Sequence, residues 1–155
     1  MRTFLSWFSG MAMVSLFIGI LPSNAVAQTI TVPDDYSTIQ LAINAAVPGD
    51  TVHVRAGTYF EHVTISKSLT LQGEDRETTI IDGSGTGKVV TVTSSYVTVS
   101  GFTIRNSGVS YSGYQQDAGI ALRSAHHNLI SDCIITANGL NGLYLYQSTY
   151  NTIRN

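Results

Sequence analysis

Apolar and polar residues alternate along most of this 155-residue chain, in short runs. Near the C-terminus the pattern occurs twice: residues 119–122 match 142–145, and 128–130 match 151–153, both at an offset of 23. Alternation places the apolar side chains on one face of a β-strand. A short fixed period indicates units that bury their apolar side only by stacking on one another. The pattern therefore predicts the rungs of a parallel β-helix.

The same alternation extends upstream, between corners marked by glycine. Strands are expected at residues 29–32, 52–54, 63–65, 69–71, 79–81, 90–92, 97–99 and 102–104. Residues 99–106 align with 130–137 at an offset of 31, eight more than 23. The extra segment, 109–116, lacks apolar alternation and contains two tyrosines, so it predicts a loop that projects from one corner. Such a loop is a usual place for function, but its tyrosines can equally cover the flank of the stack.

One helix is predicted before the first rung. Residues 39, 42, 43 and 46 are apolar, at the i, i+3, i+4 and i+7 positions of an amphipathic helix. Ser37, with Gln40 three positions later, matches a capping box at the helix start, and residues 47–50 end the helix in a turn. Because an open stack of rungs exposes an apolar end, we expect this helix to cover the first rung.

Residues 1–27 predict a signal peptide. Arg2 is the only charged residue before Asp34, and an apolar segment precedes Ala25-Val26-Ala27, a small-x-small cleavage site. The alternative, a membrane anchor, fits less well because the apolar segment is short and interrupted. We therefore expect a secreted or periplasmic domain of residues 28–155, with no membrane span after cleavage. Loss of Arg2 changes the formal net charge from −2 to −3, which provides no basic field for nucleic acid.

The chain stops at Asn155 where the repeat predicts a further strand, and no polar cap is evident. We expect a domain truncated at its C-terminus. The alternative is a last rung that pairs with another molecule.

Several segments carry a family resemblance: residues 38–43, 49–54, 56–61, 69–73, 79–83, 142–146 and 151–155. They resemble right-handed parallel β-helix proteins of the NosD-like, carbohydrate-binding and sugar-hydrolase (pectin-lyase-like) group. The resemblance implies an all-β, single-stranded right-handed parallel β-helix that recognises or processes extracellular or periplasmic polysaccharide. Two other roles stay open: a NosD-like periplasmic accessory protein for copper-enzyme maturation, and a structural cell-surface repeat module without catalysis.

If the protein is an enzyme, the resemblance implies a polysaccharide lyase or glycoside hydrolase. Residues 57–61 also resemble a pectin methylesterase motif, but that family's Gln-Asp-Thr-Leu and Asp-Phe-Ile-Phe-Gly segments are absent from the sequence. Glycoside hydrolysis needs two carboxylates about 5 to 9.5 Å apart. Asp117 and Asp132 are the candidates, and the alternative is that both are turn residues bonded to local backbone amides. No cofactor is evident; calcium is the ion that a pectate lyase would require.

The four histidines show no metal-ligand spacing, and no metal site is expected. His126 and His127 are adjacent, so on a strand their side chains point to opposite faces. Cys133 is the single cysteine, which excludes an internal disulfide. It takes the place of Phe102 in the repeat, as expected of a packing residue.

Two asparagines one period apart, Asn128 and Asn151, predict a structural ladder. Asparagine tolerates the left-handed backbone of a tight corner, and stacked asparagines can bond each other's amides along the axis.

Side chains repeated at the rung spacing of about 4.8 Å suit a polymeric ligand. Tyr111, Tyr114, Tyr144 and Tyr146 are the candidate substrate-binding residues, because an aromatic face packs on a sugar ring while the hydroxyl stays hydrated. Tyr144 and Tyr146 alternate with leucines, so we expect both to point outward.

Overall fold

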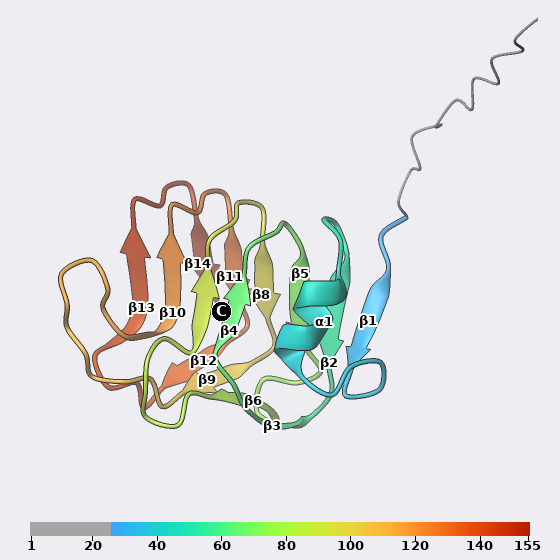
Figure 1. The fold of residues 1–155 in the computed structure, drawn as a ribbon, viewed down its shortest axis with the longest axis horizontal. Coiled ribbons are helices and arrows are strands. Elements are labelled where there is room, and N and C mark those ends of the chain that lie inside the picture. The colour runs from blue at the N-terminus through green and yellow to red at the C-terminus, as the bar shows by residue number, and fades with distance from the viewer. Residues whose placement is uncertain (1–25) are drawn as a thin grey trace, which may run out of the picture.

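Figure 1 shows the computed structural model of the protein, which describes residues 26–155 as strands stacked in three parallel sheets. Sheet A contains β1 (Thr29–Val32), β2 (Thr51–Val54), β5 (Thr70–Gly73), β8 (Thr98–Ser100), β11 (Leu129–Ser131) and β14 (Thr152–Arg154). Sheet B contains β3 (Gly57–Phe60), β6 (Thr79–Asp82), β9 (Thr103–Arg105) and β12 (Ile134–Thr136). Sheet C contains β4 (Val63–Ile65), β7 (Val90–Val92), β10 (Ala118–Arg123) and β13 (Asn141–Tyr146).

The chain visits the sheets in the order A, B, C, so each circuit adds one strand to every sheet, which confirms the predicted parallel β-helix. The strand registers reproduce the two predicted offsets. Ile120 pairs with Leu143 at the shorter offset, and Thr98 pairs with Leu129 at the longer one. The extra segment lies between β9 and β10, in a loop that extends beyond β13 at the left of Figure 1.

The predicted signal peptide falls almost entirely outside the described residues. Within residues 26–155, no helix is long and apolar enough to cross a membrane.

The apolar interior is built from columns of like side chains in register, as the alternation predicts. The columns are Val52, Leu71, Val99 and Ile130 in sheet A, with Val63, Val90, Ile120 and then Ile65, Val92, Leu122 in sheet C. Each of these side chains is at most 1% exposed, and full burial of one stabilises the fold by about 1.5–3 kcal/mol. The sheet A column ends at Ile153, which is 46% exposed on the last rung.

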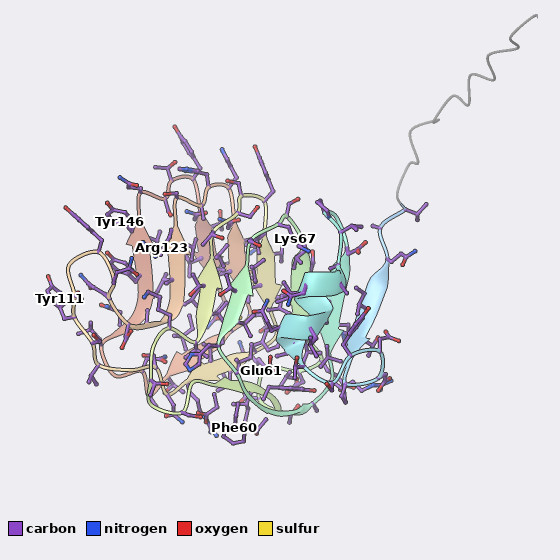
Figure 2. The ribbon with its side chains drawn as sticks, viewed as in Figure 1. Phe60, Glu61, Lys67, Tyr111, Arg123 and Tyr146 are labelled. Carbon is purple, nitrogen blue, oxygen red and sulfur yellow. The ribbon has the colours of Figure 1, made fainter. Side chains whose placement is uncertain are left out.

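The sequence pattern does not predict β3. Its Tyr59 packs against the core, whereas the neighbouring Phe60 points away from the coil and is 71% exposed (Figure 2). Strand prediction depends on alternation of apolar and polar residues. In β3 the inward Tyr59 and the outward Phe60 are both aromatic, so no alternation is seen.

The helix α1 (Ile39–Ala45) packs against β1, β2 and β4 and buries Ile39, Ala42 and Ile43, as expected of a cap on the first rung. Its N-cap was wrongly predicted: Thr38, not Ser37, accepts a hydrogen bond from the Leu41 N–H. Cap choice depends on the backbone conformation, and Thr38 has the extended one required.

Gln40 has a different partner from the one a capping box would give it. Its side-chain amide donates to the Thr64 carbonyl at 3.3 Å and accepts from the Thr64 N–H at 2.7 Å. Gln40 thereby pairs with the edge strand β4 in the way that another strand would, and it satisfies two groups of an otherwise open edge.

Two residues flanking β4 hold the ends of α1, as Figure 2 shows. The Glu61 carboxylate accepts from the N–H groups of Ile39 and Gln40, both at 3.0 Å. The Lys67 ammonium donates to the carbonyls of Asn44 and Ala46 at 3.1 and 2.7 Å. Each charge opposes the partial charge at that end of the helix, so β4 and α1 stabilise one another.

The predicted asparagine ladder exists, but its bonds differ from those expected. The Asn128 Oδ1 accepts from the Val97 N–H of the preceding rung at 2.7 Å, and the Asn151 Oδ1 accepts from the Asn128 N–H at 2.9 Å. Each side chain therefore bonds the backbone of the rung before it. The left-handed residue at each corner is the one before the asparagine, His127 (φ 56°) or Tyr150 (φ 58°).

Candidate functional site

The candidate site lies on the outer face of sheet C beside the β9–β10 loop, and Figure 2 labels three of its residues. Tyr114 of the loop packs on Tyr146 at the end of β13, with ring centroids 4.8 Å apart and a 40° angle between ring planes. Tyr111 lies earlier in the same loop. Tyr111 and Tyr114 are 71% and 66% exposed. We call Tyr111, Tyr114, Tyr146 and the neighbouring Arg123 the sheet C flank.

Tyr144 lies on the same side of β13 as Tyr146. Leu143 packs against the core, so the alternation of the strand directs Tyr144 and Tyr146 outward. Tyr144 is half-buried and pairs in register with Ala121, two positions before Arg123. The structure thus joins Tyr114 to Tyr146, and it leaves Tyr111 projecting from the loop.

Arg123 is the residue that the sequence pattern does not single out. It ends β10, directly in register with Tyr146, so the two side chains stand beside each other on one face. Its Nη1 donates to the Gln115 Oε1 at 3.1 Å, while its Nε is buried with no acceptor among the described residues. Within residues 26–155, no carboxylate lies within 4.0 Å of its guanidinium. The flank therefore carries a positive charge that no neighbouring side chain neutralises.

The structure does not bring Asp117 and Asp132 together. Asp117 precedes β10 and is 7% exposed; its Oδ2 accepts from the Ser110 N–H at 2.9 Å, which closes the base of the loop. Asp132 occupies a left-handed corner between β11 and β12, where it forms an exposed ion pair with Arg76 at 3.0 Å. Asp132 thus lies at the corner where the chain enters sheet B, and Asp117 lies after the chain has left sheet B for sheet C. Each carboxylate has its own partner.

A third carboxylate, Asp82, is 3% exposed at the end of β6. It accepts hydrogen bonds from Arg105 and Asn106, both at 2.8 Å, and from the Ser84 N–H at 2.9 Å. Burial acts to raise the pKa of this carboxyl, but the three donors and the arginine charge outweigh burial and lower it overall. Asp82 is therefore ionised and fully bonded, as expected of a residue that holds a corner.

Among the described residues, no three histidine, cysteine, aspartate or glutamate side chains gather as metal ligands would. His62 bonds the Lys88 carbonyl at 2.8 Å, and His126 bonds the Thr149 hydroxyl at 2.8 Å. Cys133 is 8% exposed within the core cluster, as predicted, and burial raises the pKa of its thiol.

Comparison with known proteins identifies the family. Residues 49–155 match the family model described as "Right handed beta helix region". The chain belongs to this family. The match assigns a right hand to the parallel coil, and it covers every circuit from β2 to β13. No curated protein sequence matches the chain significantly.

Three solved structures similar to this member of the family are pectin methylesterases. One, in complex with a hexasaccharide, has a TM-score of 0.60 at 20% identity over 77% of this chain and 45% of its own. A mutant pectin methylesterase in complex with a hexasaccharide has a TM-score of 0.60 at 20% identity, over 82% of this chain and 48% of its own. The enzyme PemA from Erwinia chrysanthemi has a TM-score of 0.55 at 19% identity, over 81% of this chain and 45% of its own. The likeness shows the fold, and this chain spans less than half the length of each enzyme.

Proposed function

We propose that this β-helix protein recognises an acidic polysaccharide on the sheet C flank, outside the cytoplasm. The observation that carries the proposal is the Arg123 guanidinium, which has no carboxylate partner among the described residues. It stands beside the half-buried Tyr146, on which the exposed Tyr114 packs. Arginine binds carboxylates through paired N–H donors, and tyrosine faces pack on sugar rings. Every unit of a uronic acid chain carries both a carboxylate and a sugar ring.

The similar structures support a polymeric sugar ligand for this fold. Two of them are pectin methylesterases in complex with hexasaccharides. The predicted signal peptide supports a location where such polymers occur. Because Asp117 and Asp132 each have a structural partner, the proposal concerns recognition, and turnover is a separate outcome of the test below.

Affinity electrophoresis of the full chain in gels containing sodium polygalacturonate tests the proposal. The wild type should be retarded, and Arg123→Gln should lose most of that retardation, because a charge-assisted contact contributes about 1.5–3 kcal/mol. Arg55→Gln is the matched control: it removes the same charge from an exposed ion pair with Asp34, and it should bind normally.

Tyr146→Ala should also weaken binding, whereas Tyr36→Ala, in the segment before α1, should leave it unchanged. Equal retardation of the wild type and Arg123→Gln would contradict the proposal. The same mixtures, assayed for new reducing ends and unsaturated products with calcium or with chelator, separate recognition from cleavage.

A further inference from the structure

A column of three aromatic rings runs along another edge of the molecule, where the turns from sheet C lead into sheet A at the top of Figure 1. Tyr96 stacks on His127 with centroids 5.3 Å apart and planes within 5°. His127 stacks on Tyr150 with centroids 5.0 Å apart and planes within 7°. The three side chains occupy equivalent positions on successive rungs, and the two tyrosines are 70% and 79% exposed.

The backbone at these positions does not favour aromatic residues. Tyr96, His127 and Tyr150 all have a positive φ, between 56° and 59°. Histidine adopts this conformation more readily than most residues, but it is costly for the two tyrosines. Most other non-glycine residues with positive φ are small: Ser84, Asn106, Ser124, Asp132 and Ala137. Exposed rings at three consecutive left-handed corners, two of them tyrosines, indicate a use for the rings themselves, since the corner alone is formed by small residues elsewhere.

One ring face at the start of the column is free. Tyr96 lies one rung above Ser68, because the Thr98 N–H donates to the Leu69 carbonyl. One face of Tyr96 is covered by His127. Beside Tyr96 is a hollow of about 110 Å³, whose other lining residues are Gly49, Ser68, Leu69 and Thr70. The small residues of the two earlier rungs thus leave space where a fourth ring would continue the stack.

A second hollow of about 370 Å³ adjoins the other end of the column, lined by His127, Asn128, Leu129, Tyr150, Thr152 and Arg154. An outward row of sheet A in register joins the two hollows: Thr70 lines the first, Leu129 and Thr152 line the second, and Thr98 lies between them. Of the residues that line either hollow, only Arg154 is charged. Hydroxyl groups at the rung spacing beside aromatic faces suit an uncharged, polyhydroxylated chain.

We propose that this surface, from Tyr96 along the outer face of sheet A to Tyr150, is a second binding site, and that its ligand is a neutral oligosaccharide. One sugar ring stacks on the free face of Tyr96, over Ser68 and Gly49. The chain continues over the outward row of sheet A, three threonines and Leu129. The surface spans about four rungs, or roughly 15–20 Å at the rung spacing, so the ligand is several sugar units long. The inference does not depend on the sheet C flank, which lies on another face.

Isothermal titration calorimetry of the full chain with cellohexaose, mannohexaose and xylohexaose tests the proposal. At least one should bind the wild type, and Tyr96→Ala should weaken it about tenfold or more through loss of ring stacking. Ser68→Phe is the sharper variant: it fills the hollow beside Tyr96, so binding should be lost while the melting temperature is kept. Tyr36→Ala is the matched control and should bind as the wild type does.

Two results would overturn the proposal. The first is a wild type that binds none of the three neutral hexasaccharides. The second is normal binding by both Tyr96→Ala and Ser68→Phe, which would leave the column a purely structural stack. Sodium polygalacturonate separates the two sites: its binding should depend on Arg123 and not on Tyr96. If it fails to bind while a neutral hexasaccharide binds through Tyr96, the sheet C proposal fails alone.

Discussion

Asn128 offers a direct test of how the corners of this coil are held. Its side chain is 2% exposed between β10 and β11, and its Oδ1 accepts from the Val97 N–H at 2.7 Å. Val97 is itself 1% exposed. In Asn128→Leu the side chain keeps a similar size but has no acceptor, so the Val97 N–H is left buried and unpaired.

The cost follows from that orphaned donor. A buried backbone N–H without a partner costs about 1–3 kcal/mol. Part of this is offset, because the Asn128 Nδ2 is itself buried with no partner among the described residues and is removed by the substitution. The net loss should be about 1–2 kcal/mol, which lowers the melting temperature of a domain of this size by about 4–8 °C.

Thermal denaturation of the full chain, followed by circular dichroism, measures the effect. Asn151→Leu is the comparison: its side chain makes the equivalent bond to the Asn128 N–H but is only half-buried on the last rung, so water can replace it. Its loss should be less than half as large. Polygalacturonate binding should not change in either variant. An unchanged melting temperature in Asn128→Leu would refute the reasoning.

Three further outcomes are expected. Glu61→Ala should lower the free energy of unfolding in urea by about 1–2 kcal/mol, because two helix N–H groups lose a charged acceptor. If the loss is no greater than that of exposed Glu77→Ala, Glu61 does not stabilise the start of α1 in this way. Gly73→Ala should not yield folded protein, since its Cβ would collide with the Gly101 carbonyl; a soluble variant with the wild-type spectrum would contradict this. The pKa of Asp82 is lowered in the folded state, so its stabilisation is complete above the unfolded value of about 3.9 and is lost as the pH falls through the folded pKa. Asp82→Asn should therefore flatten the acid side of a pH–stability curve, and an unchanged slope below about pH 4 would show that another group is responsible.

Much of the architecture can be predicted from the sequence because the interior of a β-helix repeats. Each rung buries side chains of the same kind at the same register, so alternation and a recurrent offset predict the strands and the inserted loop. The capping helix is predicted separately, from the helical spacing of its apolar residues. The same logic places Cys133 in the core, since it replaces Phe102 in the repeat. Where a strand buries an aromatic residue and exposes another, as β3 does, the pattern disappears.

The sequence predicts the candidate sites only in part. Tyrosine in an irregular loop is a local signal, and it indicated Tyr114, but the contact of Tyr114 with Tyr146 depends on how far the loop folds back. Arg123 carries no sequence signal at all. What distinguishes it is its place beside Tyr146 and the β9–β10 loop without a carboxylate partner among the described residues, and that is a property of three-dimensional surroundings.

Burial is a property of each rung, so the repeating strand, its period and the inward side chains can all be inferred from the order of residues alone. Which outward side chains meet depends on how the rungs are stacked in space. Tyr96, His127 and Tyr150 follow one another at unequal intervals along the sequence, the first longer than the second. They become one stack because loops of different length return the chain to the same corner. Outward positions are free of the packing constraint that makes the interior periodic, so their neighbours are fixed by the coil as a whole.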